Sequence, residues 1–198
     1  MICLVCTGGI GSGKSYAIKV FKALGVPSYI ADQRAKELYE TDSVLLEELV
    51  SLLGKGIIRE GRLDKREMAL RIFPNPNLLK KVNEIVHPRV LSDFLIWRES
   101  QKSIGEEVVV FESAIFFETP IFHGIEDKVI VVTAPEDVRI NRVMKRDGIT
   151  EDEVRERMSR QCSDEERLKE ADFVIYTDGK KAVLPQISKI LKSVKEKV

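Results

Sequence analysis

Five short apolar runs of four or five residues recur along the chain, separated by longer stretches in which apolar residues follow helical spacing. The runs are ICLVC (2–6), VPSYI (26–30), VVVF (108–111), KVIVV (128–132) and FVIY (173–176). Continuously apolar strands that alternate with helices are typical of a parallel sheet covered on both faces. We therefore predict an α/β fold, a three-layer, doubly wound and mostly parallel sheet of five strands.

The intervening stretches predict the helices. They are expected over 14–24, 32–40, about 135–146, 151–161, 164–170 and 181–196, with a larger helical region over roughly 42–103. Pro88 interrupts that region, which predicts either two helices or one kinked helix. The stretch of about 35–105 shows no strand pattern, so we expect a helical insertion between the second and third strands of a single domain, 1–198.

Helix starts are marked by capping residues. Thr150 with Glu153, and Ser163 with Glu166, fit the S/T-x-x-E capping box, in which side chain and backbone satisfy each other's free N–H groups. Asp64 is placed to cap the helix that follows it. These positions predict where three of the helices begin.

Charge and cysteine content indicate which partners and which compartment to expect. The 198 residues carry 32 basic and 32 acidic side chains, so there is no overall positive field for nucleic acid. Three cysteines are typical of a reducing compartment; Cys3 and Cys6 would lie on opposite faces of a strand and could not share a metal. The first apolar run is too short for a signal peptide or a membrane span. We expect a cytoplasmic protein with a small-molecule substrate and without a nucleic-acid, membrane or protein partner.

Four of the twelve glycines fall between positions 8 and 13. The segment GGIGSGKS (8–15) satisfies G-x-x-x-x-G-K-[ST] between a predicted strand and a predicted helix, the context that indicates a phosphate-binding P-loop. Its N–H groups can form an anion nest, Lys14 can reach the β- and γ-phosphates, and the Ser15 hydroxyl can bind Mg²⁺. The candidate ATP-binding residues here are Gly9, Gly11, Ser12, Gly13, Lys14, Ser15 and Tyr16.

Two other nucleotide-binding classes fit less well. The dinucleotide pattern G-x-G-x-x-G would require glycine where Lys14 stands, and no N-K-x-D motif for reading guanine is present. A short chain with a helical insertion and an arginine-rich segment favours a small-molecule kinase. A different P-loop kinase, and a nucleotide-dependent switch without transfer chemistry, remain as alternatives.

Two carboxylates follow predicted strands, at the sheet edge where ligands gather. Asp32 follows the second strand and could accept the proton of an attacking hydroxyl, or could cap the next helix. Glu112 ends the third strand and could orient Mg²⁺ through a water, or could only be solvated.

An arginine-rich segment follows the fourth strand. Arg139, Arg142 and Arg146 are spaced to lie on one helical face, and further arginines stand at 155, 157 and 160. Cations neutralise the oxygens of a transferring phosphoryl group, so we predict a lid over about 139–165. The alternative is a solvated face whose arginines pair with neighbouring acids.

Taken together, these stretches resemble the dephospho-coenzyme A kinase family. The resemblance covers nearly the whole chain through LVCTGGIGSGKS, LGVPSYIAD, VNEIVHPRV, FFE (116–118), RVMKRDGIT and QCSDEERLKEADFVI. It implies transfer of a phosphoryl group from ATP, with Mg²⁺, to the ribose 3′-hydroxyl of dephospho-CoA.

The resemblance also implies roles for single residues. Asp32 matches the carboxylate proposed as catalytic base, with Lys14 and Arg142 as the other catalytic residues. Lys14 and Ser15 match the ATP and Mg²⁺ positions, Arg142 and Arg146 match lid arginines, and Glu112 is the second metal candidate. Acceptor-side candidates are Asp32, Glu118 and His87, the last of which either touches the acceptor or packs beside Pro88.

The sequence departs from the family pattern at four places. Tyr16 replaces threonine, Ile30 replaces an acid, and Glu112-Ser113-Ala114 replaces an acid-x-proline-leucine pattern. The segment YTDG (176–179) replaces an asparagine-containing turn near the adenine, which leaves the contacts to the base open.

Overall fold

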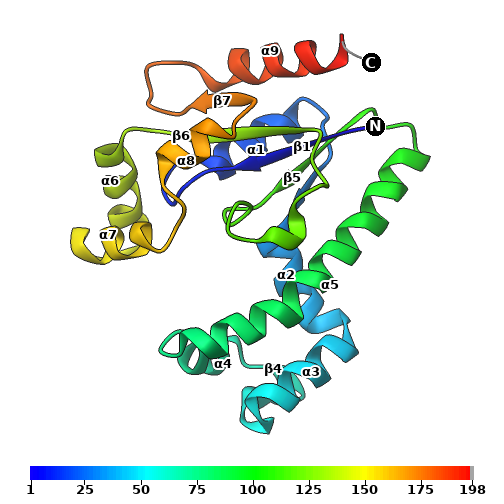
Figure 1. Cartoon of the computed structure of the whole chain (residues 1–198), viewed down its shortest axis with the longest axis vertical. Coiled ribbons are helices and arrows are strands. Elements are labelled where there is room, and N and C mark those ends of the chain that lie inside the picture. The colour runs from blue at the N-terminus through cyan, green and yellow to red at the C-terminus, as the bar shows by residue number, and fades with distance from the viewer. Residues whose placement is uncertain (197–198) are drawn as a thin grey trace. The chain divides into compact units, whose positions relative to one another are not determined.

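The computed structural model describes residues 1–196. The chain forms two compact units, one made of Met1–Ile30 together with the chain from Ser100 onward, the other of Ala31–Glu99. In Figure 1 the first unit contains the central sheet, and the second is a group of helices.

The sheet of the first unit has five strands in the order β2-β5-β1-β6-β7, and every neighbouring pair is parallel. Its strands are β1 (Ile2–Thr7), β2 (Ser28–Ile30), β5 (Val108–Glu112), β6 (Lys128–Thr133) and β7 (Phe173–Tyr176). All five predicted strands are confirmed. The second is shorter than its apolar run because Pro27, which lacks an N–H group, precedes it and cannot donate to a ladder.

One face of the sheet is covered by α1 (Lys14–Ala23) and α9 (Val183–Lys195). Their buried side chains form one hydrophobic cluster with alternate strand residues such as Leu4, Val110 and Ile130. On the opposite face Phe122, from the 3₁₀ helix η2 (Pro120–Phe122), packs edge-to-face with Phe111. The sheet is therefore buried on both sides, as its continuously apolar strands predict.

Three helices follow β6: α6 (Glu136–Asp147), α7 (Glu151–Ser159) and α8 (Asp164–Lys169). Both predicted capping boxes are present, Thr150 with Glu153 at α7 and Ser163 with Glu166 at α8. Because each box satisfies backbone N–H groups locally, these short helices begin at fixed positions. Figure 1 shows α6 and α7 side by side next to the end of β6.

The second unit contains α2 (Ala31–Thr41), α3 (Ser43–Leu53), α4 (Lys65–Ile72) and α5, which begins at Pro76 and ends at Ser103 in the first unit. Asp64 caps α4 as predicted, accepting from the N–H groups of Arg66 and Glu67. Pro88 lies inside α5, which is a single helix.

The prediction that the insertion contains no strand was wrong in one detail. Two-residue strands β3 (Ile58–Arg59) and β4 (Arg62–Leu63) form a hairpin. Glu60 and Gly61 both have positive φ, as a tight two-residue hairpin turn requires. Strands of two residues are too short to show an alternating pattern. Within residues 1–196 no helix has the length and apolar content that crossing a membrane requires.

Candidate active site

The glycine-rich segment forms the loop between β1 and α1, so the predicted strand–loop–helix context is confirmed. Gly11 and Gly13 have φ of +77° and +92°, a region that residues with a Cβ rarely adopt. A Cβ on Gly13 would lie 2.8 Å from the Thr177 hydroxyl oxygen. Both the backbone conformation and the close approach of a neighbour therefore require glycine here.

The Lys14 ammonium lies over the first part of the loop. Its Nζ donates to the carbonyl of Gly8 at 2.5 Å, with the carbonyl of Gly9 at 3.3 Å. Burial lowers the pKa of Lys14, and the negative charge of Glu112 opposes that shift. Glu112, half-buried at the end of β5, thus acts electrostatically on this ammonium.

Two serine hydroxyls of the loop differ in exposure. Ser12 is 1% exposed, and within residues 1–196 its hydroxyl has no hydrogen-bond partner. A buried hydroxyl without a partner is costly, and a ligand oxygen at the loop would satisfy it. Ser15, at the start of α1, is exposed.

Four residues distant in sequence contact the loop from outside, and one of them, Gln161, accepts from the Ile10 N–H at 2.8 Å. Arg139 Nε donates to the Ile10 carbonyl at 2.9 Å, and Arg142 Nη1 donates to the Gly11 carbonyl at 3.2 Å. The Thr177 hydroxyl donates to the Ser12 carbonyl at 2.5 Å. Arg142, predicted as a lid arginine, therefore contacts the loop backbone.

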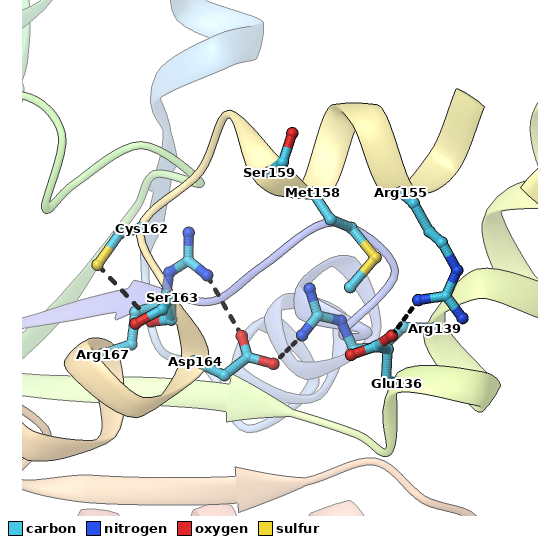
Figure 2. A pocket seen from close by; sticks show the side chains of 9 residues that line it. All are labelled: Glu136, Arg139, Arg155, Met158, Ser159, Cys162, Ser163, Asp164 and Arg167. Atoms are coloured by element: carbon cyan, nitrogen blue, oxygen red, sulfur yellow. Dashed lines mark hydrogen bonds and ion pairs between the residues drawn. The ribbon is translucent and has the colours of Figure 1, made fainter. Parts of the chain in front are cut away.

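Two arginines are almost fully buried beside the loop: Arg139, which sequence reasoning placed only in the predicted lid, and Arg167, which it did not place in the site. Arg139 is 2% exposed and Arg167 is 1% exposed. A Cβ on Gly9 would lie 2.2 Å from Arg139 Nη2 and 3.2 Å from Arg167 Nη1. Asp164 joins the two guanidinium groups, with one carboxylate oxygen on each (Figure 2).

Glu118, predicted on the acceptor side, is tied to this arginine pair. Its carboxylate accepts from Arg167 Nη2 at 3.0 Å and from the backbone N–H of Cys162 at 2.7 Å. A cavity of about 350 Å³ adjoins the pair. Its lining, drawn in Figure 2, is Glu136, Arg139, Arg155, Met158, Ser159, Cys162, Ser163, Asp164 and Arg167.

The remaining arginines of the segment form exposed ion pairs. Arg146 is exposed and pairs with Asp147, which also binds Arg157. Arg155 and Arg160 likewise pair with glutamates. The segment is therefore divided: two of its arginines contact the P-loop, and the others form exposed ion pairs, as the alternative interpretation proposed.

The two cysteines of β1, Cys3 and Cys6, are buried. Neither forms a disulfide, and burial raises the pKa of Cys6 to about 12. A thiol with so high a pKa is neither a nucleophile nor a metal ligand at neutral pH. No group of three or more potential metal-binding side chains occurs among the residues that the structure describes.

Asp32 and His87 belong to the second unit. Helix α2 begins at Ala31, so Asp32 lies inside its first turn and not at the capping position. The Asp32 carboxylate is exposed and pairs with Lys36 Nζ at 2.5 Å. His87 is half-buried in α5, and burial lowers its pKa, which favours the neutral imidazole.

Comparison with known proteins gives the same family from a family model and from individual relatives. The family model described as dephospho-CoA kinase matches residues 2–182. A dephospho-CoA kinase of Porphyromonas gingivalis is 37% identical over 198 residues, which cover all of this chain and 96% of that protein. A dephospho-CoA kinase of Bacteroides fragilis is 35% identical over 192 residues, 97% of this chain and 92% of that protein.

Solved structures agree. The Thermus thermophilus protein TT1252 is 30% identical, has a TM-score of 0.80, and is matched over 100% of this chain and 97% of its own. Dephospho-CoA kinase from Campylobacter jejuni, at 24% identity, shares the fold, with a TM-score of 0.70 and coverage of 98% and 97%. The chain belongs to the dephospho-CoA kinase family.

Proposed function

We propose that this protein transfers the γ-phosphoryl group of ATP to the ribose 3′-hydroxyl of dephospho-CoA, giving CoA and ADP, the last step of coenzyme A biosynthesis. The observation that carries the proposal is the loop of residues 8–15, with left-handed glycines and an overlying lysine, in a chain of this family. An ATP polyphosphate bound there would replace the loop carbonyls as the partner of Lys14.

The loop residues would bind the nucleotide through their N–H groups and through the dipole of α1. The buried hydroxyl of Ser12 supports this role, because a phosphate oxygen would supply the partner that it lacks among the described residues. Lys14 would neutralise the charge that develops on the β- and γ-phosphates as the terminal phosphorus–oxygen bond breaks. Tyr16, exposed on the first turn of α1, is proposed as a further nucleotide contact.

The residues present fit a magnesium ion. Mg²⁺ prefers oxygen ligands and commonly takes one or two from protein, with the rest from phosphates and water, so it needs no dense cluster of side chains. The exposed Ser15 hydroxyl is proposed as a direct ligand and Glu112 as a carboxylate that acts through water. A magnesium ion held there would offset the negative charge of the phosphates.

Asp32 is proposed as the catalytic base. As the new bond forms between the acceptor oxygen and the γ-phosphorus, the hydroxyl proton passes to the Asp32 carboxylate. Its exposure and its place two residues after β2 support this role. The exposed Lys36 ammonium would hold that carboxylate through their ion pair between turnovers.

The remaining candidate residues are proposed as substrate contacts. Arg142 and Arg146 are assigned to the phosphates, within a lid of about 139–165. Exposed ion pairs such as that of Arg146 with Asp147 are weak, so a phosphate could compete for this arginine. On the acceptor side, the candidates in addition to Asp32 are His87, within the insertion of about 35–105, and Glu118, which follows it in the sequence.

The test is an acceptor screen with labelled ATP and magnesium. We expect rapid transfer to dephospho-CoA, slow transfer to nucleoside monophosphates, and no transfer after magnesium is chelated. Faster phosphorylation of a nucleoside monophosphate would overturn the substrate assignment. Tight ATP binding without transfer to any acceptor would instead favour a nucleotide-dependent switch.

A further inference from the structure

Three successive carbonyls of the P-loop are each held by a side chain from outside the loop. The carbonyls of Ile10 and Gly11 accept from Arg139 and Arg142, and that of Ser12 accepts from Thr177. We call Arg139, Arg142 and Thr177 the carbonyl brace. Its members come from α6 and from the turn after β7, more than a hundred residues beyond the loop.

Peptide planarity makes these contacts relevant to nucleotide binding. In a trans peptide the C=O of one residue and the N–H of the next point in opposite directions. A side chain that fixes the carbonyls of Ile10, Gly11 and Ser12 therefore also fixes the N–H directions of the residues that follow them. These are the N–H groups of Gly11, Ser12 and Gly13; the Ser12 N–H donates to the Gly9 carbonyl at 3.2 Å, and the proposed function assigns the N–H groups of the loop to the phosphates.

We propose that Thr177 is a positioning residue for ATP, whose hydroxyl orients the Ser12–Gly13 peptide so that the Gly13 N–H is fixed before the nucleotide arrives. This proposal rests on the proposed function. Gly13 has a left-handed backbone and no side chain, so its own conformational preference does not fix the Ser12–Gly13 peptide, and the Thr177 hydroxyl restrains it through the Ser12 carbonyl. A donor that is already oriented costs no conformational entropy when the phosphate binds.

Thr177 itself is held firmly. It is 5% exposed, and its N–H donates to the Thr133 carbonyl at 2.9 Å, which continues the pairing of β6 and β7. Its hydroxyl accepts from Arg142 Nη1 at 3.0 Å while it donates to Ser12, and its carbonyl accepts from Arg142 Nη2. The hydroxyl proton is therefore committed to Ser12, while the oxygen accepts from Arg142.

The hydroxyl and the methyl group of Thr177 have separable roles. Both touch the space beside Gly13, where a Cβ would lie 2.8 Å from Oγ1 and 3.1 Å from Cγ2. Thr177→Ser keeps the donor and loses the methyl. Thr177→Ala loses both, so the comparison of Ala with Ser isolates the hydroxyl, and Thr177→Val keeps the shape without the donor.

The experiment measures kcat and the KM values of ATP and dephospho-CoA for the three variants, with ATP–magnesium affinity by calorimetry. We expect Thr177→Val and Thr177→Ala to weaken ATP binding about 10-fold, the usual effect of losing one hydrogen bond. The KM of dephospho-CoA should stay unchanged. We expect Ser to stay within about 3-fold of the wild type. An equal loss of ATP affinity in Thr177→Ser and Thr177→Ala would overturn the proposal. So would unchanged ATP affinity in Thr177→Val and Thr177→Ala.

Lys14→Ala serves as the control for the nucleotide site. If it leaves ATP affinity unchanged, the proposed site is wrong, whatever the Thr177 variants show. If it abolishes binding while Thr177→Ala binds as the wild type does, only the positioning role fails. Thermal unfolding identifies any variant that is misfolded, and the Ala–Ser comparison decides the matter if Val does not fold.

Discussion

Gly9 shows at the scale of one residue how the loop depends on its neighbours. A methyl group at this position would meet the Arg139 guanidinium at 2.2 Å and displace it from the Ile10 carbonyl. We expect Gly9→Ala to lower the free energy of unfolding by about 1–3 kcal/mol, the usual cost of overpacking, and also to raise the KM of ATP. Urea unfolding and steady-state kinetics measure the two effects.

Gly56 offers a matched control. A Cβ there would lie 2.5 Å from Arg71 Nη2, and Arg71 donates to the Leu53 carbonyl, so the crowding is similar. Because these residues belong to the second unit, we expect Gly56→Ala to cost stability while the KM of ATP stays unchanged. An equal rise in that KM would show that the effect of Gly9→Ala is only a loss of stability.

Asp32 is the residue whose role depends most directly on proton transfer. We expect Asp32→Asn to lower kcat by about 10²–10⁴-fold, nearer the lower figure because a loose transition state needs little help from a base. The KM of ATP should change little. Rapid-quench measurement of a single turnover separates the chemical step from product release.

Lys36→Met tests whether the ion pair of Asp32 carries part of that effect. It removes an exposed partner and leaves the carboxylate in place. Exposed pairs contribute about 0–1 kcal/mol, so kcat should remain within about 5-fold of the wild type. A loss as large as that of Asp32→Asn would point to a positional role for the pair.

The sequence did not predict that Arg139 and Arg167 are buried. The spacing of Arg139, Arg142 and Arg146 predicts one helical face, but not which residue of that face is buried. Arginine is seldom fully buried without a partner, and the partner, Asp164, lies 25 residues away. Arg167 gave no signal of its own, since its contacts with the site arise only when α8 is placed beside the loop.

Helix α8 carries two neighbouring acidic residues, Asp164 and Glu165, whose ion pairs differ in burial. Asp164 joins two guanidinium groups that are 2% and 1% exposed, whereas its neighbour Glu165 pairs with the exposed Lys169. We expect Asp164→Asn to cost about 1–3 kcal/mol of stability, because two buried charges lose an ionic partner. Denaturant unfolding measures this cost.

Glu165→Gln provides the control on the same helix. It removes one carboxylate from an exposed pair, so we expect a change below about 0.5 kcal/mol. If the two variants lose the same stability, the Asp164 bridge contributes no more than a surface pair. A rise in ATP KM for Asp164→Asn alone would show that the bridge also holds Arg139 on the loop.

Elements with a strong local signal were predictable. The capping boxes at Thr150 and Ser163 and the cap at Asp64 depend on residues within three positions, so sequence alone places these helix starts. The hairpin of β3 and β4 depends on a two-residue turn and a single pair of neighbours on each side. Its signal is therefore too weak to stand out from the surrounding helices.

For the whole molecule, periodicity predicts five parallel strands but not their order. The order β2-β5-β1-β6-β7 places β1 at the centre, and the P-loop follows that strand. The turn after β7 and the start of α6 come to the same loop only because their strands lie on the same side of β1. Residues such as Thr177 cannot be assigned to the loop until that order is known.

The two compact units allow the two substrates to be followed separately. Hydrogen exchange with ATP and magnesium should slow the amides of residues 9–15, because their N–H groups bind phosphate oxygens. Dephospho-CoA alone should slow amides within 31–99, where the insertion is proposed to hold the acceptor. At 100 times its dissociation constant a ligand stabilises the state it binds by about 2.7 kcal/mol, so amides that exchange only through that opening should slow by about 100-fold.

Lys14→Ala distinguishes local binding from general stiffening. It should remove the protection that ATP gives to residues 9–15 and leave the protection that dephospho-CoA gives to 31–99 unchanged. Protection of 31–99 by ATP alone, at the same magnitude, would contradict the division of the substrates between the units. Because exchange is read amide by amide, the same experiment reports whether Gly13 N–H is protected in the wild type but not in Thr177→Ala, and so connects the hydroxyl of one residue to the binding of a whole nucleotide.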